Sequence, residues 1–188
     1  MKQIVFLLEE ESMKALLDNL LPRLLPAEIN FLCIPHEGKQ DLEKSIPRKL
    51  KAWQCSETSF VVIRDQDRAD CVDVKNRLVR LCSDAGRPDS LVRIACHELE
   101  SWFLGDLIAV ENAFNIKKLA IQQQKSTFKD PDKLTNAKEE LKKLVKSYQT
   151  VSGAKLIGPH MSLKNNQSHS FNCFIDGIYK MIKHNFVS

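Results

Sequence analysis

The chain has 188 residues, of which 43% are hydrophobic and 28% are charged, and its formal net charge is +4. Such a composition is typical of one soluble globular domain, with or without a small appendage, and the mild positive charge permits nucleic-acid binding without arguing for it. No apolar run approaches the roughly 20 residues that span a membrane, and the first one is too short for a secretory signal. We therefore expect a cytoplasmic protein that does not contact a membrane.

Six cysteines are spread along the chain, and none of them forms a Cys-x-x-Cys pair. Several lie inside apolar runs, as Cys33 and Cys96 do. This pattern predicts reduced thiols in the core of a protein from a reducing compartment. A zinc site would need cysteines and histidines at close, regular spacing, which this sequence lacks.

Strands and helices are predicted to alternate over the first 115 residues. Each predicted strand is a short apolar run, and each predicted helix carries apolar residues three or four positions apart. Strands that are apolar on both faces and alternate with helices form parallel sheets covered on both sides, so we expect an α/β fold with a mostly parallel four-stranded sheet. The predicted strands cover residues 2–8, 29–35, 60–63 and 91–96, and the predicted helices cover residues 13–24, 42–53, 72–82 and 98–114.

The second part of the chain, residues 116–188, is richer in lysine and has few strand signals. Helices are predicted there over residues 134–148 and 168–182. We expect these residues to form a helical C-terminal extension that packs on an α/β core of residues 1–115, so that the whole is a single compact domain. The lysines of the extension could follow a phosphate backbone, or they could simply form a solvated helical face.

Acidic residues directly follow three of the four predicted strands. In a parallel sheet these strand ends lie on one edge, where crowded carboxylates raise each other's pKa unless a cation compensates. Their hard oxygen ligands suit Mg²⁺ or Mn²⁺, and two such ions would activate water for an in-line displacement. The sequence therefore predicts a metal site. Its candidate residues are Glu9, Glu10 and Glu11 after the first strand, Asp65 and Asp67 after the third, and Glu98 and Glu100 after the fourth.

The same acidic residues also have a purely structural interpretation. Asp stabilises turns and Glu favours the first turn of a helix, so any one group alone could be structural. The spacing of Asp65 and Asp67 favours a joint role, because alternate side chains past a strand end point the same way. Glu98 and Glu100 would share a face on a continuing strand, but on a helix they would diverge by about 200° and only one could bind the ion.

Four stretches of the sequence resemble a bacterial family that is labelled as a domain of unknown function, family 4276. Members of that family are thought to be Toprim-like. Together the Glu-x-Glu-x-Trp and Asp-x-Asp motifs are fairly specific, and the resemblance extends over nearly the whole chain. The stretches are residues 36–42, residues 64–67 with the sequence Arg-Asp-Gln-Asp, residues 93–106 with the sequence His-Glu-Leu-Glu-Ser-Trp in their middle, and residues 155–176.

An acidic first-strand end followed by Asp-x-Asp also resembles the Toprim domains of primases, topoisomerases and overcoming-lysogenization-defect nucleases. This resemblance implies a Toprim-like, Rossmann-like fold in which the first-strand Glu is an acid/base or metal ligand and the Asp-x-Asp carboxylates hold Mg²⁺. The glycine that usually follows the first Glu is Glu10 here. Carried over by position, the catalytic candidates are Glu9, Glu11, Asp65, Asp67, Glu98 and Glu100, and the metal ligands are Glu9, Asp65, Asp67 and Glu100.

Three further side chains are candidates for contacts with a phosphate-bearing substrate. Lys39 follows a glycine in a predicted loop, His97 lies at a predicted strand end, and Lys155 follows another glycine. Each could meet a phosphate or supply transition-state charge. Each also has an ordinary interpretation, as a solvated lysine or as a hydrogen-bonded histidine.

The acidic strand ends and the resemblance together imply a metal-dependent nuclease or phosphotransfer effector that cleaves DNA or RNA. Members of the family often neighbour ATPase genes in mobile or defence loci, which implies phage defence together with an ATPase partner of the AAA or ABC type. The alternative is a non-catalytic module that binds such an ATPase, nucleic acid or both. A nuclease of this size could also require a partner or a homo-oligomer to be active.

Overall fold

The computed structural model describes residues 2–186 and contains a four-stranded sheet in the order β2-β1-β3-β4. All three strand pairs are parallel, which confirms the α/β fold predicted from the alternating pattern. The central strands β1 and β3 are buried along most of their length, as continuous apolar runs require. The strands are β1 (Gln3–Leu8), β2 (Asn30–Pro35), β3 (Thr58–Asp65) and β4 (Leu91–Ala95).

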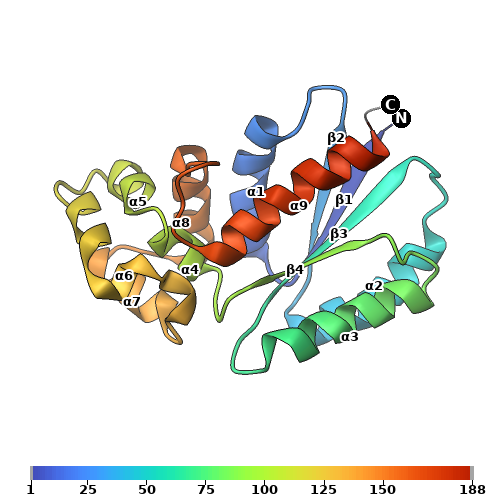
Figure 1. Ribbon diagram of the computed structural model, residues 1–188, viewed down its shortest axis with the longest axis horizontal. Coiled ribbons are helices and arrows are strands. Elements are labelled where there is room, and N and C mark those ends of the chain that lie inside the picture. The colour runs from blue at the N-terminus through green and yellow to red at the C-terminus, as the bar shows by residue number, and fades with distance from the viewer. Residues whose placement is uncertain (1, 187–188) are drawn as a thin grey trace.

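Helices cover both faces of this sheet (Figure 1). Because side chains alternate along a strand, Ile4 and Phe6 pack in the core on one face, and Val5 and Leu7 pack in a separate core on the other face. Helices α1 and α9 close the first core, and α2 and α3 close the second. These helices are α1 (Glu11–Leu24), α2 (Lys39–Ala52), α3 (Cys71–Asp84) and α9 (His169–Asn185).

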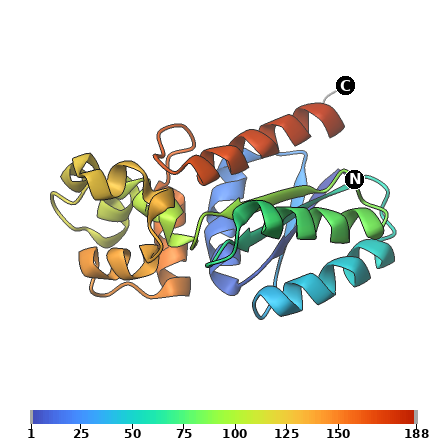
Figure 2. The same ribbon diagram turned by 60° about the horizontal axis from the view of Figure 1, so that its bottom comes forward.

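The remaining helices form a group of short segments beside the end of the sheet to which β4 leads (Figure 2). Their core is continuous with that of the α1/α9 face. Trp102 joins the two parts, because its ring stacks on Phe174 of α9 with 5.3 Å between ring centroids. The segments are α4 (Glu100–Leu104), α5 (Leu107–Phe114), η1 (Ala120–Gln124), α6 (Ser126–Lys129), η2 (Pro131–Lys133), α7 (Ala137–Leu144), α8 (Thr150–Ile157) and η3 (Gly158–His160).

The single helix expected over residues 98–114 is two helices, α4 and α5, which are separated at Asp106. The side chain of Asp106 caps α5 by accepting a hydrogen bond from the Ala109 amide at 3.0 Å. Its other oxygen accepts a hydrogen bond from the Ser162 amide at 2.7 Å. Aspartate is among the strongest N-cap residues, so this side chain starts a new helix and ties it to the chain before α9.

Other helix limits also differ from the expectation. The helix predicted over residues 134–148 is only α7, which ends at Leu144, and Tyr148 lies beyond it in a turn. Helix α1 begins at Glu11, two residues before the expected start, and continues past Pro22 to the expected end at Leu24. Within residues 2–186, no helix combines the length and the apolar character needed to cross a membrane.

Candidate functional site

Two of the predicted acidic residues meet where β1 and β3 end. Glu9 directly follows β1, and Asp65 is the last residue of β3. The two strands are neighbours in the sheet, and the Asp65 amide donates a hydrogen bond to Glu9 Oε2 at 3.0 Å. The Glu9 amide in turn donates to the Ile63 carbonyl at 3.2 Å. The backbone of the sheet therefore holds both carboxylates at one edge.

A third predicted acidic residue reaches this edge from α4. The Glu100 side chain is buried, and its Oε1 accepts a hydrogen bond from the Tyr148 hydroxyl at 3.0 Å. The ammonium of Lys138, on α7, lies 4.0 Å from the same oxygen. The electrostatic field of Glu100 also acts on Asp65, as does that of Glu10. We call Glu9, Glu10, Asp65 and Glu100 the carboxylate cluster.

Three carboxyl groups of the cluster, those of Glu9, Asp65 and Glu100, have raised pKa values. Burial raises the pKa of Asp65 well above its usual range, and the charges of the other three members raise it further. Burial is also the largest cause of the raised pKa of Glu9 and of Glu100. Burial therefore favours the neutral forms of these carboxyl groups, and a cation placed among them would favour the charged forms.

One carboxylate oxygen of the cluster lacks a hydrogen bond. Asp65 Oδ1 is buried and has no hydrogen-bond partner among the described residues. Carboxylate oxygens suit hard divalent cations, and Mg²⁺ is commonly held by one or two carboxylates together with water and substrate phosphate. Within residues 2–186, no three His, Cys, Asp or Glu side chains are placed to hold an ion by themselves. Glu9 and Asp65 could therefore hold Mg²⁺ or Mn²⁺ only together with oxygens from water or a substrate.

One buried cation, Arg64, forms ion pairs with a member of the carboxylate cluster and with a neighbouring glutamate. The Arg64 side chain is only 5% exposed, and its Nη1 lies 2.6 Å from Glu43 Oε1. Its Nε lies 3.7 Å from Glu9 Oε2. Burying an arginine is costly unless acids surround it, so Arg64 and these two glutamates depend on one another.

Asp67 does not share a face with Asp65. Residue 67 has a φ of 58° in the left-handed region, so the alternation of an extended strand does not continue past Asp65. The Asp67 carboxylate pairs with Lys39 Nζ at 2.9 Å, and Arg64 Nη2 lies 4.0 Å away. The Asp67 amide donates to the His97 carbonyl at 2.8 Å, and His97 Nδ1 lies 3.1 Å from the Asp67 carbonyl oxygen. Lys39 and His97, two of the residues proposed to contact substrate, therefore both interact with Asp67 and stabilise the turn at this residue.

Three other predicted residues lie outside the carboxylate cluster. Glu11 begins α1 and is exposed. Glu98 Oε2 accepts a hydrogen bond from the Lys138 amide at 2.8 Å, so this glutamate serves the first turn of α7. Lys155 is exposed on α8 and makes no hydrogen bond or ion pair among the described residues. Because β4 ends at Ala95, Glu98 and Glu100 do not lie on a continuing strand.

A family model supports one part of the resemblance seen in the sequence. The model of "Domain of unknown function (DUF4276)" matches residues 8–179, which include the whole carboxylate cluster. The chain belongs to this family. Searches of the curated proteins and of the solved structures gave no match.

Sequence reasoning missed several residues that complete this site in the DUF4276 chain. Arg64 had a signal, since it is a charged residue in an otherwise apolar strand and directly precedes Asp65. Glu43, Lys138 and Tyr148 had none, because each reaches the site from a distant helix or turn. Their positions follow from tertiary packing alone.

Proposed function

We propose that the protein is a Mg²⁺- or Mn²⁺-dependent phosphodiesterase that acts on nucleic acid and is related to the Toprim domains of overcoming-lysogenization-defect nucleases. The observation that carries the proposal is the carboxylate cluster, in which the buried Oδ1 of Asp65 has no hydrogen-bond partner among the described residues. A divalent cation would stabilise the charged forms of these carboxylates. Such an ion, once bound, polarises a phosphate and lowers the pKa of a coordinated water.

The residues of the chain have distinct parts in this proposal. Glu9 and Asp65 would hold the ion, since the sheet fixes them at one edge. Glu100 would hold or release a proton at its carboxylate, which burial keeps basic and the Tyr148 hydroxyl orients. Lys39, exposed at the rim and paired with Asp67, would exchange that carboxylate for a substrate phosphate.

The biological setting is proposed on the sequence resemblance. The protein would be an effector in phage defence, and its partner would be an ATPase of the AAA or ABC type. That ATPase would deliver nucleic acid to the sheet edge that carries the carboxylate cluster. The mild net charge of +4 supports that dependence, because a self-sufficient nucleic-acid enzyme usually carries a stronger basic surface. A homo-oligomer would be another way to enlarge the basic surface that contacts nucleic acid.

A non-catalytic module that binds an ATPase or nucleic acid is the second candidate. It is favoured by cations that already occupy part of the site, namely Lys39 on Asp67 and Arg64 on Glu9. Glu10 also stands where Toprim domains usually have glycine. In this alternative, the ion pairs are permanent and no metal enters.

The deciding experiment is calorimetric titration of Mn²⁺ into the wild type and into Asp65→Asn. We expect binding by the wild type and binding at least about tenfold weaker in the variant, which keeps the shape of the side chain but removes its charge. Glu11→Gln is the matched control, because Glu11 is an exposed acid outside the cluster and its loss should change nothing.

Cleavage assays on DNA and RNA then separate the two candidates. Loss of Mn²⁺-dependent cleavage in Asp65→Asn, with retention in Glu11→Gln, supports the phosphodiesterase. A wild type that binds no Mn²⁺ refutes it and leaves the non-catalytic module. Metal binding without cleavage of any nucleic acid, alone or with a neighbouring ATPase, refutes the catalytic part only.

A further inference from the structure

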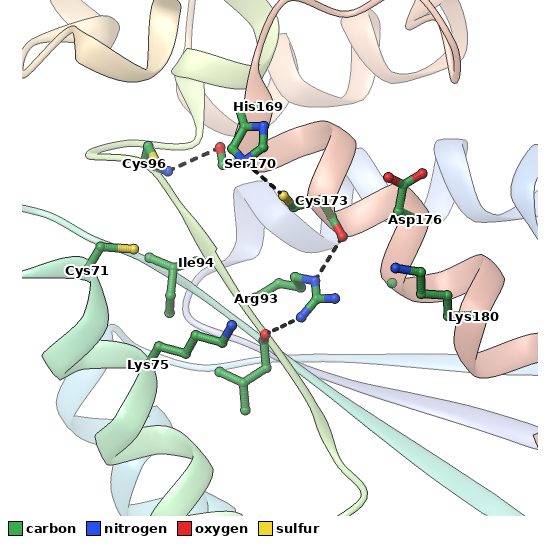
Figure 3. A pocket seen from close by; sticks show the side chains of 12 residues that line it. Cys71, Lys75, Arg93, Ile94, Cys96, His169, Ser170, Cys173, Asp176 and Lys180 are labelled. Carbon is green, nitrogen blue, oxygen red and sulfur yellow. Dashed lines mark hydrogen bonds between the residues drawn. The ribbon is translucent and has the colours of Figure 1, made fainter. Parts of the chain in front are cut away.

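A second site lies along β4, the edge strand, and shares no residue with the carboxylate cluster. It is a pocket of about 310 Å³ between α3 and α9 (Figure 3). This volume is at the lower end of the range for small-molecule sites. The charges that line it have the opposite sign to those of the carboxylate cluster.

The cation at the back of the pocket is Arg93 of β4. Its Nε donates to the Cys173 carbonyl and its Nη1 to the Val92 carbonyl, each at 2.9 Å. It forms no ion pair with a carboxylate among the described residues. A Cβ at residue 177 would lie 2.3 Å from Nη2, so a glycine in the middle of α9 makes room for the guanidinium. Backbone carbonyls therefore hold Arg93 in place, and the one carboxylate whose charge acts on it is that of Asp176, which is not in direct contact with it among the described residues.

Two lysines flank Arg93 from opposite sides. Lys75 comes from α3 and Lys180 from α9, and both line the pocket (Figure 3). Neither ammonium has a hydrogen-bond or ion-pair partner among the described residues. Asp176 is the one acid in the lining, which also contains His169, so one arginine and two lysines share the pocket with a single carboxylate. Like charges kept together without partners favour an anion from solution.

Part of the pocket lining carries no charge, and we call this part the apolar wall. It is formed by Val92 and Ile94 of β4 and by the thiols of Cys71 and Cys96. Burial raises the pKa of Cys96 to about 12 and also raises that of Cys71, so both thiols are neutral at physiological pH. An apolar wall beside a cluster of cations suits a molecule with an anionic head and a less polar body.

We propose that this pocket binds a small phosphomonoester of about mononucleotide size, with its phosphate on Arg93, Lys75 and Lys180 and its body against Val92 and Ile94. A phosphate dianion matches three cations better than a monocarboxylate does. The planar guanidinium also fits the geometry of phosphate oxygens. The proposal does not depend on the carboxylate cluster or on metal-dependent chemistry.

Calorimetric titration of the full chain in EDTA tests the proposal, since chelation prevents any metal-bridged phosphate at the carboxylate cluster. The ligands are AMP, inorganic phosphate and adenosine. We expect AMP to bind more tightly than phosphate and adenosine to show no binding. Absence of AMP and phosphate binding up to about 10 mM would refute the site. Adenosine that binds as well as AMP would refute the role of the anion, and phosphate that binds as well as AMP would refute the role of the apolar wall.

Single substitutions place the binding in the pocket. Lys75→Gln and Lys180→Gln should each weaken AMP binding about threefold or more, and neither should disturb folding, because both side chains are exposed and unpaired. Arg93→Lys should weaken it about tenfold, because the charge remains but the fork of donors is lost. Lys183→Gln is the matched control, since Lys183 is exposed on α9 outside the pocket lining. Equal affinity in all four variants would refute the assignment.

Discussion

The carboxylate cluster and the basic pocket beside β4 are built in opposite ways. In the cluster, negative charge is buried, and the cation that balances part of it, Arg64, is buried with it. In the pocket, the positive charges of Lys75 and Lys180 are exposed and have no partner among the described residues. The charges of the cluster therefore interact with one another inside the protein, whereas the lysine charges of the pocket face solvent without a protein partner.

This difference decides what substitutions should do. Removing one partner from a buried group of charges leaves the others uncompensated in a poorly solvated place, which is costly. Removing an exposed, unpaired charge leaves nothing behind and changes stability little. The four predictions that follow test this contrast, from the largest expected effect on stability to the smallest.

Arg64→Met should have the largest effect. It leaves Glu9 and Glu43 without their buried cation, and we expect the free energy of unfolding to fall by about 3–5 kcal/mol. Urea denaturation measures this change. Arg80→Met is the matched control, because Arg80 is exposed on α3 and forms no ion pair within residues 2–186. A loss no larger than that of the control would show that Arg64 does not support the cluster.

Tyr148→Phe should have the next largest effect. The variant removes the hydroxyl that donates to the buried Glu100 carboxylate at 3.0 Å, and the lost hydrogen bond is expected to cost about 1.5–3 kcal/mol. Thermal or urea unfolding would detect it. Tyr179→Phe provides the comparison, since Tyr179 is 47% exposed on α9. If both variants unfold alike, the Tyr148 contact contributes nothing to stability.

Asp65→Asn should make the metal-free protein more stable at high pH. The folded pKa of Asp65 is raised, so its contribution to stability is fully present below the unfolded pKa of about 4 and is lost as the pH rises through the folded pKa. The variant escapes this loss, and its advantage over the wild type should grow to the order of 1 kcal/mol. Urea unfolding at several pH values measures the difference. An advantage that stays constant with pH would contradict the raised pKa.

The lysines of the basic pocket should matter least for stability. Lys75 and Lys180 form no hydrogen bond or ion pair among the described residues of the folded protein. Replacing either lysine with glutamine should therefore change the free energy of unfolding by no more than about 0.5 kcal/mol. The same urea experiments provide the measurement. A loss above about 1 kcal/mol in either variant would mean that the pocket charge belongs to the fold, as the cluster charge does.

The sequence was sufficient to predict the sheet, because a parallel strand buried on both faces must be apolar throughout and must be joined to the next strand by a helix. It also located Glu9 and Asp65 correctly at strand ends, because an apolar run shows where a strand stops. That the two acids touch depends on the strand order, which places β1 next to β3. Apolar periodicity does not encode that order.

Tertiary structure alone decided the rest of both sites. Asp67 does not share a face with Asp65, because residue 67 has a left-handed backbone conformation. Glu98 accepts a hydrogen bond from the backbone of α7 instead of facing the carboxylate cluster. The partners of the carboxylate cluster and the three cations of the pocket come from segments far apart in the chain. A local pattern reports which face of an element is apolar, but it does not report which distant polar side chains will meet, because that depends on how whole elements pack.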